Sequence, residues 1–238
     1  MKFLMLIVSV FFFISGFSQQ VNEDSIANVQ VKNAVAVYNQ YTDGNAAVYN
    51  GAQYMRYTFK MEGNPYFLSN DFTQGWVSYE GRRYDSLSVL YDIARNEVVI
   101  LYTDGYSDVV LENDFIDSFN MAGHTFVKLQ EDHGQNLYNS GFYDELYNGK
   151  TSLIARRVKK MDEVIRNEVT RRFFETDRFY VRKNGLYYWV SNKKDVFKLF
   201  SNKKRDIKKM LSKQHLKMKR SNFENVLTRV VAFYDQLT

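Results

Sequence analysis

The pattern of hydrophobic and polar residues divides this chain into three parts. An apolar run from Phe3 to Ile14, interrupted only by Ser9, follows Lys2 near the start of the chain. From residue 46 to residue 190, short runs rich in β-branched and aromatic residues alternate with turns that contain Gly and Asn. After residue 192, apolar residues recur every three to four positions, which is the spacing of amphipathic helices.

The N-terminal apolar run is typical of a secretory signal peptide. Lys2 supplies the positive start, and Gly16 and Ser18 place small residues at positions −3 and −1 of a cleavage site before Gln19. A transmembrane anchor is the alternative, but the run is shorter than the roughly 20 residues that a helix needs to cross a bilayer. We therefore expect residues 1–18 to be removed and the mature protein to be exported to the periplasm or the extracellular space.

Ser25–Tyr41 is the first candidate element of the mature chain. Its apolar residues fall at helical spacing, and Asp43-Gly44 follows as a stop signal. The valines of the same segment would suit a strand equally well. Helix and strand both stay open here, with the helix preferred.

Four two-residue turns in the central part predict β-hairpins. Asn50-Gly51, Asn148-Gly149 and Asn184-Gly185 each separate two runs of strand-forming residues, and Glu80-Gly81 is a weaker fourth case. Such turns require positive φ at both central positions, which Asn and Gly tolerate. Further strands are expected at residues 96–102, 107–112 and 124–130. Strands that recur about every ten residues without intervening helices predict an antiparallel meander, either barrel-like or sandwich-like.

Three amphipathic helices are predicted near the C-terminus, over residues 193–200, 202–213 and 222–237. In the last of them, Ser221 and Glu224 form a capping box. Its apolar residues share one helix face: Phe223, Val226, Leu227, Val230, Val231 and Tyr234.

Packing of these helices on the β-rich part predicts an α+β fold. The expected organisation is a signal peptide at 1–18, a β-rich body with a possible N-terminal helix at 19–190, and a basic helical segment packed on that body at 191–238.

Composition supports the β-rich body and restricts the chemistry. Aromatic residues make up 16% of the chain, and they fit half-buried strands better than helix interiors. The chain has no cysteine, which excludes disulfides, thiolate metal ligands, a cysteine nucleophile and a lipidated N-terminal cysteine. No segment after the leader approaches the length of a membrane span, so we expect no integral membrane segment after cleavage.

Positive charge is concentrated between residues 192 and 220. This segment holds twelve Lys or Arg residues and two acids, a local balance of +10, whereas the whole chain carries +5. Such a density attracts polyanions, although a solvated, solubilising helix face is the alternative. For an exported protein we expect anionic lipid, lipopolysaccharide or an acidic protein surface as partner, and no nucleic acid. The candidate anion-binding residues are Lys203, Lys204, Arg205, Lys208 and Lys209.

The search for catalytic and metal-binding signatures is largely negative. The motifs of serine hydrolases, zinc proteases, phosphate-binding loops and dinucleotide-binding folds are absent. His124 and His133, with Glu131-Asp132, could hold zinc only if the fold brings the two histidines together. Asp104–Asp108 could offer oxygens to calcium, but its spacing is more simply that of a turn. We therefore assign no catalytic residue, cofactor or metal.

Acid pairs for glycoside hydrolysis can be nominated but not placed. Asp92, Asp144 and Glu145 adjoin aromatic residues that could stack on sugars. The distance between the two carboxylates decides this chemistry, and the sequence does not contain it.

Several motifs built from turns and aromatic residues resemble those of uncharacterised secreted proteins of the Bacteroidota. In chain order they are Tyr49–Tyr54 (YNGAQY), Gly63–Phe67 (GNPYF), Gly75–Gly81 (GWVSYEG), Leu90–Asp92 (LYD), Gly123–Phe126 (GHTF) and Gly141–Lys150 (GFYDELYNGK). The resemblance covers most of the mature chain and extends to the lysine-rich helices. It implies export in a Gram-negative cell envelope, and because no activity is known for the group it implies none here.

Three functions remain open. The first is an exported, non-catalytic cell-envelope protein that acts as a scaffold or binding platform and contacts an anionic partner through its basic C-terminal helices. The alternatives are an envelope hydrolase acting on a polymer substrate and a β-barrel carrier of a small apolar ligand. A polar pocket with convergent acids would favour the hydrolase, a large apolar cavity the carrier, and a filled core with one basic face the binding platform.

Overall fold

The computed structural model describes residues 47–165 and 169–238, which belong to one compact unit. The predicted signal peptide and the candidate element Ser25–Tyr41 lie outside the described residues. No helix of the described residues is long and apolar enough to cross a membrane.

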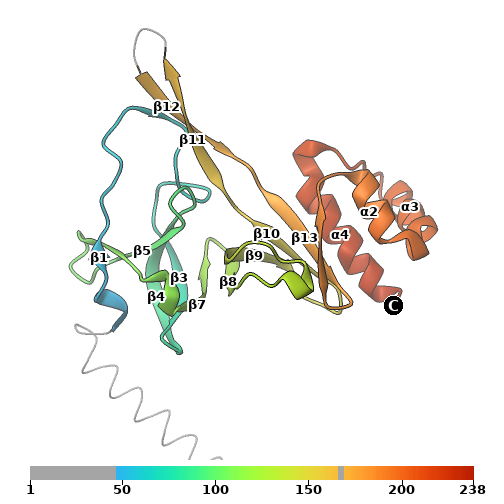
Figure 1. Ribbon diagram of the computed structural model, residues 1–238, viewed down its shortest axis with the longest axis horizontal. Helices are drawn as coiled ribbons and strands as arrows, with labels where there is room; N and C mark the ends of the chain where they lie inside the picture. Colours follow the sequence, from blue (N-terminus) through green and yellow to red (C-terminus); the bar gives the residue numbers. More distant parts are fainter. Residues whose placement is uncertain (1–46, 166–168) are drawn as a thin grey trace, which may run out of the picture. The chain divides into compact units, whose positions relative to one another are not determined.

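The main feature is one antiparallel sheet of eleven strands (Figure 1). In space they follow the order β1-β6-β5-β4-β3-β7-β8-β9-β10-β13-β14, so most neighbours in the sheet are also neighbours in sequence. In the part of the chain that the structure describes, β1 and β14 each pair on one side only. The predicted antiparallel meander is therefore confirmed, in an open form. The strands are β1 (Ala52–Gln53), β3 (Thr73–Tyr79), β4 (Arg82–Asp92), β5 (Glu97–Leu101), β6 (Asp108–Val110), β7 (Ile116–Met121), β8 (His124–Leu129), β9 (Gly141–Tyr147), β10 (Ser152–Arg156), β13 (Arg178–Lys183) and β14 (Leu186–Val190).

Three other strands form a small second sheet that the sequence analysis did not predict. They are β2 (Met61–Glu62), β11 (Lys159–Ile165) and β12 (Val169–Glu175), in the order β11-β12-β2. The β12–β2 pair is parallel, whereas β11 and β12 are antiparallel. Short 3-10 helices connect the strands and helices elsewhere: η2 (Ala47–Tyr49), η3 (Asn113–Phe115), η4 (His133–Gln135), η5 (Ser201–Lys203) and η6 (Arg220–Asn222).

Three of the four predicted turns connect paired strands. Glu80-Gly81 joins β3 to β4 and Asn184-Gly185 joins β13 to β14, and all four residues have the predicted positive φ, between 51° and 81°. Asn148-Gly149 lies between the paired strands β9 and β10, but neither of its residues has positive φ. The hairpin is confirmed there, and the predicted turn geometry is wrong.

The fourth predicted hairpin, at Asn50-Gly51, is wrong. The residues before the turn form η2, and β1 pairs with β6 through Ala52 and Val110. Gly51 approaches the backbone carbonyl of Val110 so closely that a Cβ atom would overlap it. The glycine is needed for this long-range contact and not for a local turn.

The three predicted C-terminal helices are confirmed as α2 (Lys193–Leu199), α3 (Lys204–Lys213) and α4 (Phe223–Gln236). All six apolar residues assigned to one face of α4 are buried. The predicted capping box is wrong, because Ser221 lies inside η6 and α4 begins after Asn222. The carboxylate of Glu224 binds the buried guanidinium of Arg157 instead, and such charge-assisted bonds are stronger than neutral ones.

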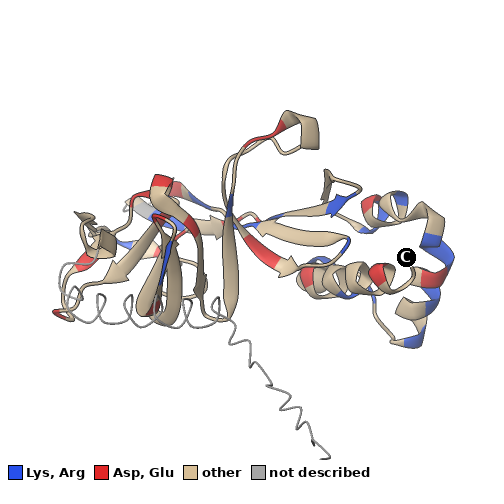
Figure 2. Cartoon of the chain, turned by 90° about the horizontal axis from the view of Figure 1, so that it is seen from below, with Lys and Arg blue, Asp and Glu red and all other residues tan. Residues whose placement is uncertain are grey.

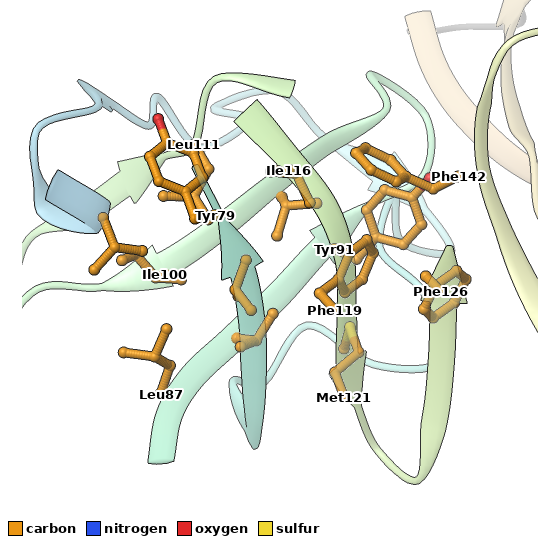
Figure 3. Packing of buried hydrophobic residues seen from close by; sticks show 14 of the residues in the cluster. Tyr79, Leu87, Tyr91, Ile100, Leu111, Ile116, Phe119, Met121, Phe126 and Phe142 are labelled. Atoms are coloured by element: carbon orange, nitrogen blue, oxygen red, sulfur yellow. The ribbon is translucent and has the colours of Figure 1, made fainter. Parts of the chain in front are cut away.

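Two large hydrophobic clusters stabilise the unit. The first packs aromatic residues of β4, β7, β8 and β9 together: the ring centres of Phe119 and Phe126 are 4.8 Å apart, and Tyr91 meets both at 5.1 Å (Figure 3). In the second, Leu153, Val181 and Val190 of the sheet pack with the apolar residues of the three helices. Each fully buried large side chain contributes roughly 1.5–3 kcal/mol, so the helices are anchored firmly to β10, β13 and β14.

Candidate functional site

The Lys and Arg residues between positions 192 and 220 lie mainly on the outer faces of α2 and α3 and on the chain that follows α3 (Figure 2). We call these twelve residues the basic helical surface. The orientation of α3 is fixed by its buried apolar residues, Ile207, Met210 and Leu211. Of the five predicted anion-binding residues, Lys203 is partly buried and the other four are exposed: Lys204, Arg205, Lys208 and Lys209.

In the part of the chain that the structure describes, no residue of the basic helical surface forms an ion pair. Asp195, one of the two acids of this segment, accepts hydrogen bonds from Ser191 and Asn192 at the start of α2. Several cations of the β-rich part do form ion pairs; for example, Arg171 pairs with Glu163 and Arg172 pairs with Glu62. The charge of the basic helical surface is therefore not neutralised by ion pairs within the described residues.

Three lysines of this surface converge on one aromatic ring. The Nζ atoms of Lys193, Lys204 and Lys208 lie 5.6, 5.9 and 5.8 Å from the centre of the Phe197 ring. Phe197 is only 8% exposed and belongs to the core beneath the helices. Cation–π attraction of about 0.5–1 kcal/mol at an exposed site offsets part of the repulsion among the three ammonium groups.

An open pocket of about 350 Å³, which we call the Phe197 pocket, lies beside this ring. Its polar lining consists of Lys193, Lys208, Lys217, His215 and Ser212. Its apolar lining consists of Phe197, Leu211, Leu216 and Met218.

A larger open groove of about 1360 Å³ lies between the start of α4 and the strands β13 and β14. Trp189, which is 63% exposed, lines this groove together with the acids Asp177 and Glu224. Lys193 and Met218 line both the groove and the Phe197 pocket. The groove therefore opens next to the basic helical surface.

A buried ion cluster centred on Arg157 lies at one side of the groove. Arg157 Nε and Nη2 donate to Asp144 Oδ2 at 2.9 and 2.5 Å. Nη1 donates to Asp177 Oδ2 at 2.5 Å, and Nη1 and Nη2 bind the two oxygens of Glu224 at 2.7 and 3.0 Å. His124 Nδ1 lies 2.9 Å from Asp144 Oδ2. This Arg157 cluster joins β8, β9, the β12–β13 connection and the first turn of α4.

The Arg157 cluster shifts the pKa of three of its members. Burial alone would lower the pKa of Arg157, but the hydrogen bond to Glu224 and the charges of Asp144 and Asp177 outweigh it and raise this pKa above its ordinary value. Burial raises the pKa of Asp177 to about 6, against the opposing effect of Arg157. The hydrogen bond to Asp144 raises the pKa of His124. The folded protein therefore binds protons at Asp177 and at His124 more tightly than the unfolded chain does.

The acids nominated for glycoside hydrolysis do not form a site. Asp92 is fully buried and accepts hydrogen bonds from the hydroxyls of Tyr54 and Tyr57 at 2.8 and 2.9 Å. Asp144 is fully buried in the Arg157 cluster, and Glu145 accepts a hydrogen bond from Asn148. Three acids line the groove: Asp177 and Glu224 bind Arg157, whereas Glu175 is exposed at the end of β12.

The nominated histidines do not come together either. His124 contacts Asp144, whereas His133 contacts Glu131. Among the described residues, no group of three His, Cys, Asp or Glu side chains could hold a metal ion. Asp104 accepts hydrogen bonds from Tyr106 and Ser107, as the turn interpretation predicts.

No protein-family model, no curated protein and no solved structure matches this chain. Sequence reasoning found the lysines of the basic helical surface but missed Phe197 and Arg157. Lys193 and Phe197 lie four positions apart on one helix, and this spacing is the signal that could have indicated Phe197. No local signal indicates Arg157.

Proposed function

We propose that this protein is an exported, non-catalytic binding protein of the cell envelope whose basic helical surface contacts an anionic partner. The observation that carries the proposal is that none of these twelve cations has an ion-pair partner within the described residues. Like charges held close together repel one another, and a bound polyanion relieves this repulsion.

The way in which the helices are anchored supports a binding platform. The apolar residues of α2, α3 and α4 are buried in one cluster with Leu153, Val181 and Val190 of the sheet, so the outer faces present their charges on fixed backbone positions. A preorganised surface loses less conformational entropy on binding than a disordered basic tail does. The same anchoring allows exposed lysines to be replaced without changes to the core.

The non-catalytic part of the proposal is supported by the acids that a hydrolase would need. Asp92 and Asp144 are buried and occupied by structural hydrogen bonds. Of the three acids that line the groove, Asp177 and Glu224 are bound by Arg157, and Glu175 lies outside this cluster. Glycoside hydrolysis needs a pair of carboxyl groups placed on either side of the scissile bond, whereas these two carboxylates are held against one guanidinium.

Cosedimentation with vesicles that contain phosphatidylglycerol tests the proposal. The test variant replaces Lys203, Lys204, Arg205, Lys208 and Lys209 with Gln. Because each Lys or Arg near an anionic membrane contributes about 1 kcal/mol, we expect the five substitutions to weaken binding at low salt by at least tenfold. Circular dichroism and thermal unfolding are expected to show an unchanged fold, since the buried residues of α3 are retained.

A charge-matched control separates this surface from the net charge of the protein. The control replaces five cations of the β-rich part with Gln: Lys60, Arg83, Lys150, Lys160 and Arg172. We expect this variant to bind like the wild type. Equal vesicle binding by the wild type and the test variant, or equal losses in the test and control variants, would overturn the proposal.

A further inference from the structure

We infer that the Phe197 pocket binds an amphiphilic anion, an anionic head group joined to an apolar chain. This inference rests on the proposed function, because it names the class of anion that the basic helical surface takes at one defined place. It adds a site in which charge and apolar surface act together, whereas surface charge alone would not distinguish one anion from another.

The lysines of the pocket give its polar side a positive charge. Lys193, Lys208 and Lys217 line it, and no carboxylate of the described residues does. Two of these lysines, Lys193 and Lys208, also belong to the group whose ammonium nitrogens lie within 6 Å of the Phe197 ring centre. A head group such as a phosphate would thus meet several ammonium donors from both α2 and α3.

The apolar side of the pocket is built by the end of α3. His215 has a left-handed backbone conformation with φ of 53°, and the amide nitrogens of His215 and Leu216 donate to the carbonyl oxygens of Ser212 and Leu211. This pair of hydrogen bonds is the Schellman ending of a helix, which brings Leu216 against Leu211. The wall next to the lysines is therefore a fixed apolar surface.

The size of the pocket fits a small ligand. A volume of about 350 Å³ lies at the lower end of the range for small-molecule sites, roughly 300–1,000 Å³. Its floor, Phe197 and Leu211, is part of the core, and its wall residues Leu216 and Met218 are only partly buried. An apolar chain that covers these wall residues removes their exposed surface from water, which favours binding.

Isothermal titration calorimetry with three probes tests this inference. Octyl phosphate has both features, inorganic phosphate has the charge only, and octyl glucoside has the chain with a neutral head group. Octyl phosphate and octyl glucoside are used below their critical micelle concentrations. We expect octyl phosphate to bind at least tenfold more tightly than either of the other probes. Octyl phosphate binding no tighter than inorganic phosphate would overturn the inference.

A matched pair of variants locates the site. Ser212 is exposed and lines the pocket, so Ser212→Trp fills the pocket without changing the charge. Ser201 is exposed and does not line the pocket, so Ser201→Trp is the control. We expect Ser212→Trp to weaken octyl phosphate binding at least tenfold and Ser201→Trp to leave it unchanged. Equal effects of the two variants would overturn the inference.

The vesicle assay separates this inference from the proposed function. Vesicle binding without octyl phosphate binding would leave the proposed function standing and overturn the pocket. A second outcome is that the wild type binds octyl phosphate but not vesicles, and that Ser212→Trp abolishes the octyl phosphate binding. This outcome would establish the pocket as a site for a free amphiphile and overturn the proposed function. Loss of both octyl phosphate and vesicle binding in Ser212→Trp would support the pocket and identify a bilayer lipid as its ligand.

Discussion

Arg157 connects side chains that lie up to 67 positions away in the sequence. Its guanidinium group is buried, and its partner Asp144 has no exposed surface. Removal of one partner from a buried ion pair leaves an uncompensated charge, which costs about 3–5 kcal/mol. We therefore expect Arg157→Met to lower the free energy of unfolding by about this amount, as measured by urea denaturation. Arg182→Met, at an exposed arginine, is the control with an expected change within about 0.5 kcal/mol; similar changes in both variants would contradict the structural role of Arg157.

Two titratable groups of the Arg157 cluster make stability depend on pH. The folded-state pKa of Asp177 is raised to about 6, and that of His124 is also raised. A raised folded-state pKa means that the folded protein binds protons more tightly than the unfolded chain does. Each such group therefore stabilises the folded state fully at low pH, and this stabilisation is lost as the pH rises through the folded-state pKa. The window runs from about pH 4 to 6 for Asp177 and upward from about 6.5 for His124.

We accordingly expect the thermal midpoint to be higher at pH 5 than at pH 8. Asp177→Asn should remove the part of this dependence that falls between pH 4 and 6, which corresponds to about 1–3 kcal/mol. Thermal unfolding of the wild type and of Asp177→Asn from pH 4 to pH 8, followed by circular dichroism, measures both effects. A wild-type midpoint that rises steadily from pH 5 to pH 8 would show that these groups do not carry the shifts described above.

At the scale of elements, the connection between β9 and β10 is held by α4. Asp235 near the end of α4 accepts hydrogen bonds from the backbone of Thr151 at 2.9 and 3.1 Å and from Tyr147 at 3.3 Å. Gly149 lies so close to the same carboxylate that a Cβ atom would overlap it. The glycine here makes room for a helix side chain, and it does not supply positive φ.

Gly149→Val should therefore destabilise the protein by about 1–3 kcal/mol through overpacking. Because Asp235 is one of the groups that the new side chain would meet, the cost should be smaller in an Asp235→Ala background, and a double-mutant cycle by urea denaturation measures this coupling. Additive effects of the two substitutions would contradict the contact between this connection and α4.

The elements that could be predicted from the sequence are those whose signals are local. Asn184-Gly185 is flanked by strand-forming residues, and its positive φ values follow from the two residues themselves. The apolar face of α4 is likewise read from its spacing. The strands β11 and β12 were missed because charged residues such as Lys159, Asp162 and Arg172 interrupt any strict alternation, and their pairing with β2 is long-range.

The candidate site was predictable only in part for the same reason. The density of lysines is a property of sequence, so the basic helical surface was found. The convergence of Lys204 and Lys208 on Phe197 depends on how α3 packs beside α2, which sequence spacing does not define. Asp144 was considered as a catalytic acid, because its neighbours in sequence do not reveal that Arg157 and His124 bind it.

At the scale of the whole molecule, charge is divided unequally. The segment 192–220 carries +10, and the rest of the chain sums to −5 because the total is +5. Figure 2 shows Lys and Arg gathered on the C-terminal helices, while acidic residues are spread over the β-rich part. Such an asymmetry orients the protein in the field of an anionic surface before contact. This electrostatic attraction acts over about 8 Å at physiological salt.

The salt dependence of vesicle binding tests the central claim most directly. The affinity of the wild type for phosphatidylglycerol vesicles is measured from low to physiological and higher salt, beside the five-residue Gln variant of the basic helical surface. We expect the wild-type affinity to fall steeply as salt rises and the variant to show weaker binding with a much shallower dependence, because mobile ions screen the charges that carry the interaction. Wild-type affinity that does not change with salt, or the same slope in the two proteins, would contradict the claim that these cations bind an anionic partner.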